Sequence, residues 1–180
     1  MENKINNVNL KSIQETINNA KSDPSILKKK IQIEGEWILD KKLDYQFKAE
    51  AKYGKGTAIF EIDSPTWMGG NDTRPGPMLY CIAGVASCFM STFVTIASLN
   101  NIIFKSLKIR AECDINFSKV LELSNEPIIE EVNFFVDATA LNASNEELQK
   151  IVEKAKSQCP AIYSLTNIIK TNVYLNKPSK

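Results

Sequence analysis

Alternation of apolar and polar side chains defines the first part of the chain. Residues 31–39 and 45–51 alternate in this way and predict two strands joined by a short polar turn. Gly54 and Gly56 then turn the chain into a third apolar run at residues 57–62. Three strands joined by short turns predict an antiparallel meander.

A loop of turn-forming residues at 64–76 separates this meander from a long apolar segment. Pro77 suits the first position of a helix, and no charged residue lies between Arg74 and Lys105. The pattern predicts a helix to about Leu99 that is apolar on every side. Such a helix either lies in the middle of a domain or spans a bilayer. Its many hydroxyl side chains, its flanking strands and the lack of a Lys or Arg cluster favour the central helix.

Two more strands and a capped helix follow the apolar helix. Residues 104–117 alternate cleanly and predict a long strand with one apolar face. Residues 128–141 predict a second strand, which pairs with the first across a turn at 124–127. Residues 144–147 fit a capping box and open a helix that continues to about residue 157.

The order of these elements predicts an α+β fold with a mainly antiparallel sheet. Residues 159–160 begin a short helix, and residues 171–175 form a closing strand. Residues 1–30 are predicted to be a helical extension, with a helix at residues 8–20 that docks on the main body. Residues 31–180 form a single domain.

The uncharged helix also predicts assembly. A chain of 180 residues with this fold has few elements left to cover every side of the helix. A second copy buries it most simply, and the small residues Ala83, Gly84 and Ala86 permit close contact. We therefore expect an obligate homodimer.

Composition excludes several classes of function. With 22 basic and 21 acidic residues the net charge is +1. The electrostatic field of such a charge is too weak to attract nucleic acid or an anionic membrane. The chain has no histidine, which rules out Ser-His-Asp triads, Cys-His pairs and His-containing zinc sites. The polar, Asn-rich residues 1–10 lack the pattern of a secretory signal. We expect a cytoplasmic protein with reduced cysteines.

The four cysteines are the sharply nucleophilic side chains of this chain. They are Cys81, Cys88, Cys113 and Cys159, and no C-x-x-C spacing among them supports a zinc site. Cys81 and Cys88 are about 10 Å apart along a helix, too far for a disulfide. Cys113 fits a small buried residue on its strand.

Cys88 and Cys159 are the candidate reactive pair. A thiol deep in an apolar helix has a raised pKa and is inert unless a cation or donor approaches it, so a plain core role for Cys88 stays open. Cys159 directly precedes Pro160 and falls at the start of a helix, where free N–H groups and the helix dipole favour a negative charge. If a redox pair exists, these two residues form it.

The motifs together resemble the OsmC/Ohr family of osmotically inducible and organic hydroperoxide resistance proteins. The resemblance rests on Pro-Gly-Pro-Met at residues 75–78, the small-residue helix ending in Ser-Cys-Phe at 87–89, and Cys-Pro-Ala at 159–161. It covers roughly residues 31–175. It implies an OsmC-like fold with antiparallel sheets around a long central helix, in an intertwined homodimer with the active site at the subunit interface.

The resemblance implies a thiol-dependent peroxidase that reduces organic hydroperoxides in the oxidative stress response. Cys88 matches the peroxidatic cysteine, which becomes a sulfenic acid. Cys159 matches the resolving cysteine, which forms an intramolecular disulfide that an external dithiol reduces. No bound cofactor or metal is implied.

One part of the family pattern is missing. Related chains carry Glu just after the proline that opens the helix, where this chain has Met78 and Leu79. An arginine at the site must therefore be held by another acid, Glu61 or Asp63, or it stays loosely held. Arg74 is the candidate partner of the thiolate, although an exposed loop charge is an equally good interpretation, and Arg110 lies on a polar strand face. The alternative function is a non-catalytic dimer of the same fold that binds a small apolar molecule.

Overall fold

The computed structural model describes residues 4–176 and is built around one long helix, α2 (Pro77–Leu99). Pro77 takes the first helical position, where its missing N–H would have no carbonyl partner. At the other end Asn101 has φ of 58°, which a continuing helix does not allow. The predicted helix is confirmed from end to end.

The amino-terminal strands form the predicted meander. β3 (Glu34–Trp37), β4 (Phe47–Tyr53) and β5 (Gly56–Ile62) pair in that order, and all pairs are antiparallel. β3 is shorter than the predicted strand at residues 31–39, because it is an edge strand whose ladder with β4 ends at Trp37. All four of its residues are exposed.

The second sheet consists of two long strands, β6 (Phe104–Glu112) and β7 (Asn133–Ala140). Their antiparallel pairing is confirmed, with partly buried and exposed residues alternating along both strands. The predicted turn at residues 124–127 lies within a longer connection that spans residues 113–132. The connection is this long because the hydrogen-bonded pairing of the two strands ends at the pair Glu112–Asn133.

Two helices complete the domain. α3 (Asn145–Gln158) opens with the predicted capping box, in which Ser144 accepts the N–H of Glu147 and donates its own N–H to the Glu147 carboxylate. α4 (Pro160–Thr166) follows after a single residue, Cys159. The α+β class predicted from the order of elements is confirmed.

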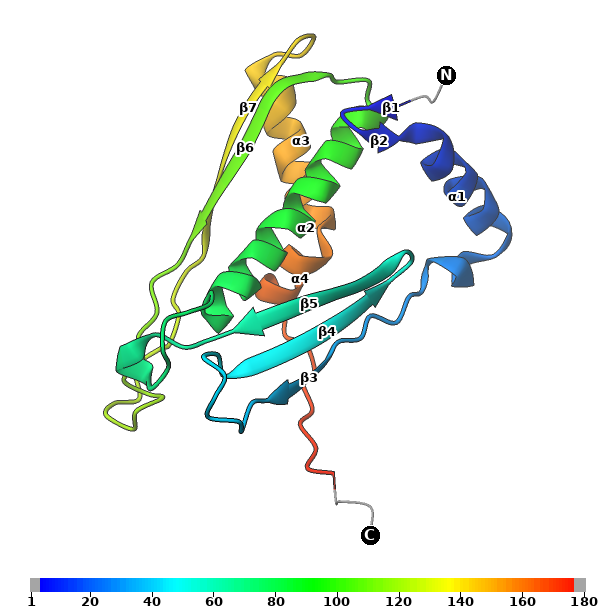
Figure 1. Ribbon diagram of the computed structural model, residues 1–180. Helices are drawn as coiled ribbons and strands as arrows, with labels where there is room; N and C mark the ends of the chain where they lie inside the picture. The colour runs from blue at the N-terminus through cyan, green and yellow to red at the C-terminus, as the bar shows by residue number, and fades with distance from the viewer. Residues whose placement is uncertain (1–3, 177–180) are drawn as a thin grey trace.

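The core lies on the side of α2 that faces α3, α4 and β6 (Figure 1). Phe93 is fully buried there, with its ring 6.3 Å from that of Phe89 and 5.4 Å from that of Phe104 between centroids. The buried cluster comprises Phe89, Phe93, Ile96, Ala97, Ile102, Leu148, Ile151, Ala155, Cys159 and Ile162.

The other side of α2 is open within one chain. Cys81, Gly84, Ser87 and Ser91 lie exposed at helical spacing, and a β-carbon at Gly84 would meet no atom within 4 Å. Only 22% of the most apolar stretch of the helix is buried. Among residues 4–176, α2 is the one helix long and apolar enough to cross a membrane, a test that the central helix of a domain also passes.

The amino-terminal extension contacts the body through a hairpin that sequence patterning misses. β1 (Lys4–Ile5) and β2 (Val8–Asn9) form this hairpin, and α1 (Leu10–Ser22) and a 3-10 turn, η1 (Pro24–Leu27), follow. α1 confirms the predicted helix but buries none of its residues and stands away from α2 (Figure 1). The hairpin, rather than the helix, docks on the main body.

Asn6 fixes this hairpin to the end of α2. Its φ of 51°, with 65° at Asn7, suits a two-residue hairpin turn. The Asn6 amide donates to Ser98 Oγ at 3.0 Å and to the Ile102 carbonyl at 2.8 Å, and its Oδ1 accepts the N–H of Phe104 at 2.9 Å. Because Ser98 is fully buried, these bonds satisfy polar groups inside the fold.

The predicted closing strand at residues 171–175 is wrong. The segment is irregular in the structure, with Val173 93% exposed and Leu175 99% exposed. Alternating side chains make a strand only where a neighbouring backbone accepts its hydrogen bonds, and none pairs with this segment in the described chain. Residues 1–3 and 177–180, at the ends of the predicted extension and domain, lie outside the described residues.

Candidate active site

The structure brings Cys88 and Cys159 together. Their Sγ atoms are 3.7 Å apart, although the residues are 71 positions apart in the chain. A disulfide has an S–S length of about 2.05 Å, so the sulfurs need to approach by only about 1.6 Å to bond. Both thiols are free in the structure.

Local sequence explains why Cys159 points at α2. The N–H of Cys159 ends α3 by bonding to the Ala155 carbonyl, and its carbonyl accepts the N–H of Tyr163 in α4. Pro160 cannot continue α3 but suits the first position of α4. Cys159 therefore sits at the corner between two helices that both pack on α2, and it is fully buried.

The environment of Cys88 both raises and lowers its pKa. Burial raises the pKa of the Cys88 thiol above its ordinary value, because the thiolate loses hydration. The backbone N–H of Ala161, in the first turn of α4, donates to the sulfur and partly offsets this rise. The second sulfur, Cys159, adds to the rise. The start of α4 thus acts on Cys88, whereas the sequence placed that effect on Cys159.

Arg74 lies in the loop that feeds α2 and is tightly held. Its Nε donates to Glu61 Oε2 at 2.8 Å, its Nη2 lies 3.5 Å from Asp44 Oδ1, and its guanidinium is 5.6 Å from the ring centroid of Tyr45. The hydrogen bond to Glu61 raises the pKa of Arg74. Within the described residues of one chain, Arg74 is not among the groups that shift the pKa of Cys88.

A buried carboxylate shapes the same loop. Asp63 is 1% exposed, and its Oδ2 accepts the N–H groups of Asn71 at 2.8 Å and Thr73 at 3.2 Å. Although burial raises it, these N–H groups hold the pKa of Asp63 below its ordinary value. Asp63 fixes the backbone just before Arg74, and Glu61 orients the guanidinium.

Glu61 is a residue that sequence reasoning named only as one of two possible acids. It lies on β5, and its backbone carbonyl also accepts the Tyr80 hydroxyl at 3.0 Å. Met78 and Leu79 occupy the first turn of α2, where Leu79 is 64% exposed. The carboxylate that pairs with arginine therefore comes from the sheet in this chain and not from the helix.

The remaining cysteines lie apart from the pair. Cys81 is exposed on α2, and Cys113 is partly buried just after β6. Neither forms a disulfide in the structure. No group of three or more Cys, Asp or Glu residues is arranged to hold a metal ion anywhere in the described residues 4–176.

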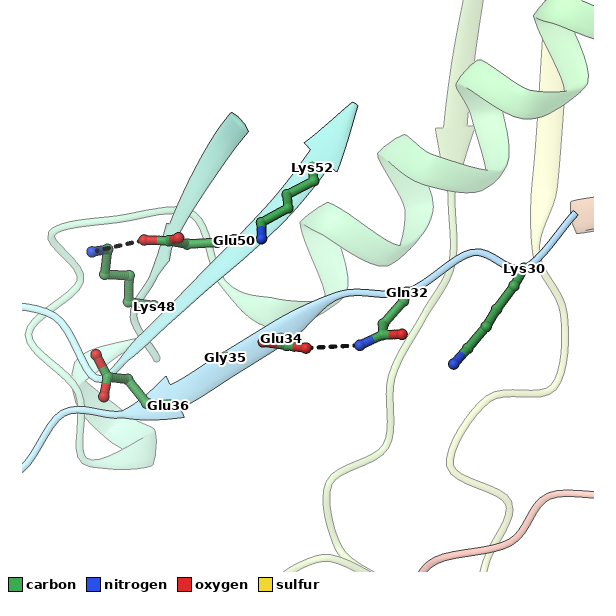
Figure 2. A pocket seen from close by; sticks show the side chains of 8 residues that line it. All are labelled: Lys30, Gln32, Glu34, Gly35, Glu36, Lys48, Glu50 and Lys52. Carbon is green, nitrogen blue, oxygen red and sulfur yellow. Dashed lines mark hydrogen bonds and ion pairs between the residues drawn. The ribbon is translucent and has the colours of Figure 1, made fainter. Parts of the chain in front are cut away.

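A hollow of about 650 Å³ lies on the exposed face of β3 and β4, away from α2 (Figure 2). Three lysines and three glutamates line it with a glutamine and a glycine, so its charges balance. Lys48 pairs with Glu50 at 3.2 Å, and Gln32 donates to Glu34 at 2.7 Å. The hollow contains no cysteine and contributes nothing to the thiol site.

The arrangement defines a class of protein: a small α+β domain whose central helix presents a thiol to a second cysteine at a helix start. The family model described as OsmC-like protein matches residues 69–173, more than half of the chain. The chain therefore belongs to the OsmC-like family, as its motifs predict. No curated protein matches it.

Solved structures show the same fold. An OsmC-like protein from Mycoplasma pneumoniae is 18% identical, with a TM-score of 0.57 over 79% of this chain and 91% of that one. An organic hydroperoxide resistance protein OsmC from Legionella pneumophila is 16% identical, with a TM-score of 0.53 over 77% and 92%. An organic hydroperoxide resistance protein from Elizabethkingia anophelis is 20% identical, with a TM-score of 0.51 over 78% and 91%.

Proposed function

We propose that this protein is a thiol-dependent peroxidase that reduces organic hydroperoxides, with Cys88 as the peroxidatic and Cys159 as the resolving cysteine. The observation that carries the proposal is the 3.7 Å approach of the two sulfurs. A pair of free thiols this close suits reversible oxidation to a disulfide. The names of the Legionella and Elizabethkingia structures support the choice of substrate class.

The chemistry balances in two steps. The Cys88 thiolate attacks the terminal oxygen of the hydroperoxide, the S–O bond forms as the O–O bond breaks, and the leaving alkoxide takes up a proton to become the alcohol. Cys88 is then a sulfenic acid. The Cys159 sulfur attacks the Cys88 sulfur, the S–S bond forms, and the hydroxyl leaves as water with a proton. An external dithiol reduces the disulfide by thiol exchange, and no cofactor takes part.

In the homodimer proposed below, where the first turn of α2 faces Cys88 of the other copy, the approach to the thiol favours organic peroxides over hydrogen peroxide. Met78 and Leu79 place apolar side chains in the first turn of α2, where related chains carry a carboxylate. Apolar side chains there stabilise the organic part of a bulky hydroperoxide by burying it. Hydrogen peroxide has no apolar group to bury and gains nothing from them.

The site needs a cation, and a second copy of the chain supplies it in this proposal. The small, exposed residues of α2 centre on Gly84, so two α2 helices crossing antiparallel there form a homodimer. Tyr80 lies as far before Gly84 as Cys88 lies after it, so each Cys88 then faces the first helical turn of the other copy. The Arg74–Glu61 pair adjoins that turn through Tyr80. Arg74 of one copy thus stabilises the Cys88 thiolate of the other.

Consumption of an alkyl hydroperoxide with a dithiol reductant tests the function. We expect turnover by wild type and none by Cys88→Ser, whereas Cys159→Ser performs a single oxidation without disulfide formation. Cys113→Ser is the matched control, since Cys113 is partly buried like Cys88 but lies outside the pair. Equal turnover by Cys88→Ser and wild type would refute the peroxidase.

One observation favours the alternative, a non-catalytic dimer that binds a small apolar molecule. Burial raises the pKa of Cys88, and a mainly protonated thiol is a poor nucleophile. The alkylation rate of Cys88 in the intact protein separates the two. A rate at pH 7 equal to that of an unactivated thiol favours the binding protein, and a faster rate favours the peroxidase.

A further inference from the structure

α1 carries an apolar stripe that its own chain covers only in part. Leu10, Ile13, Ile17 and Ala20 recur at intervals of three and four residues and so share one face of the helix. None of them is fully buried: Leu10, Ile13 and Ala20 are partly covered, and Ile17 is 40% exposed. A helix with an apolar face in water is stable only when that face packs on something.

The segment around α1 is anchored at both ends. Before it, the β1–β2 hairpin is bonded to the end of α2 through Asn6. After it, the chain enters β3, which is paired with β4. Between these anchors Leu27, Ile31 and Ile33 are 59%, 93% and 60% exposed. We call residues 10–33 the arm: it is held in place and presents apolar side chains outward.

The position of the arm indicates that a second copy of this chain packs against its apolar side chains. α3, α4 and β6 pack on α2, and α1 lies across α2 from β6 (Figure 1). A stable dimer buries about 800 Å² on each partner. Around Gly84, Ser87 and Ser91 the exposed stripe of α2 has only small side chains, and the large exposed ones, Leu79 and Leu99, lie near the ends of the helix, so the helix alone gives a narrow contact. The arm supplies the additional apolar area.

We propose that the arm clasps the second copy of the chain, with the stripe of α1 packed against the partner. The proposal rests on the homodimer proposed above and adds a contact to it. In a two-fold dimer the contact occurs twice, so each copy is held by the arm of the other. Removing the stripe therefore weakens the dimer without altering the fold of the single domain.

Site-specific cross-linking of the purified protein tests whether the contact is between chains. A photo-reactive benzoyl-phenylalanine in place of Ile17 is expected to give a product of twice the chain mass. The same group in place of Glu15, on the opposite face of α1 and exposed, is the control and gives none. Cross-links from position 17 only within one chain, or equal dimer products from both positions, would overturn the proposal.

The dissociation constant of the dimer gives a second readout. Replacing both Ile13 and Ile17 by Asp removes two apolar contacts per copy and should raise that constant at least about 100-fold. The matched double variant, Gln14→Asp with Asn18→Asp, adds the same charge to the polar face and should change it less than about threefold. If wild type is a dimer and both double variants weaken it equally, the arm contact is refuted while the homodimer stands. If wild type is a monomer, both the arm contact and the homodimer are refuted.

Discussion

The N–H of Ala161 offers a direct test of how the fold prepares Cys88. This N–H donates to the Cys88 sulfur and opposes the rise in pKa that burial causes. Replacing the Ala161 amide by an ester removes the donor and leaves every side chain in place. Because residue 159 is a cysteine, the chain can be assembled by ligating residues 1–158 to a synthetic peptide of residues 159–180.

The expected size of the effect follows from the burial of the site. A hydrogen bond to a charged group contributes about 1.5–3 kcal/mol, and the lower value applies because Cys88 is only partly buried. About 1.5 kcal/mol corresponds to about a tenfold change in the thiolate fraction at a given pH below the pKa. The thiolate is the reactive form, so below the pKa the rate rises about tenfold per pH unit. Losing the donor moves this rise to higher pH and lowers the rate at neutral pH about tenfold.

The assay is the pH dependence of Cys88 alkylation, followed by mass spectrometry of its peptide, together with the rate of hydroperoxide reduction. An ester at Tyr163 is the matched control, because its N–H bonds to the Cys159 carbonyl within the helix and not to Cys88. We expect its pH profile to match that of the all-amide chain. If the Ala161 ester leaves the profile unchanged, or the Tyr163 ester shifts it as much, α4 does not tune the thiol.

Three further outcomes are expected. Mixing Cys88→Ser with Arg74→Met, each inactive alone, should restore about a quarter of wild-type turnover if Arg74 acts across the dimer, and none if it acts within one chain. Leu79→Glu should raise hydroperoxide turnover, because it supplies a second carboxylate near the helix start to hold Arg74; an unchanged rate means Glu61 already suffices. Phe93→Ala should lower the free energy of unfolding by about 3–5 kcal/mol in urea titration, and Phe135→Ala, 43% exposed, by clearly less.

Local signals predicted the elements that position the thiols. Pro77 fixed the start of α2, the capping box at Ser144 fixed the start of α3, and Cys159-Pro160 fixed the corner before α4. Each depends on contacts within a few residues, which is why the sequence alone reveals them. Cysteine chemistry singled out Cys88 and Cys159 as the pair to expect if a redox pair exists, but only the family resemblance implied that they meet, because no local pattern states which helices pack together.

Features that depend on distant partners escaped the sequence. The hairpin at residues 4–9 had a signal in the Asn6-Asn7 pair, since asparagine tolerates positive φ, but its polar composition hid it. The strand predicted at residues 171–175 failed because its partner is not in the described chain. The choice of Glu61 over Asp63 for Arg74 depends on side-chain direction: Asp63 points inward to the loop backbone, and Glu61 reaches the guanidinium.

A peptide map of the protein after one equivalent of an alkyl hydroperoxide, under non-reducing conditions, tests the redox pair most directly. We expect the dominant product to be a disulfide between Cys88 and Cys159 of the same chain, with Cys81 and Cys113 still free. Prior mixing of isotopically light and heavy chains distinguishes this product from a bond between chains. A dominant Cys81–Cys113 link, or cross-links between chains alone, would contradict the assignment of Cys88 and Cys159 as the redox pair.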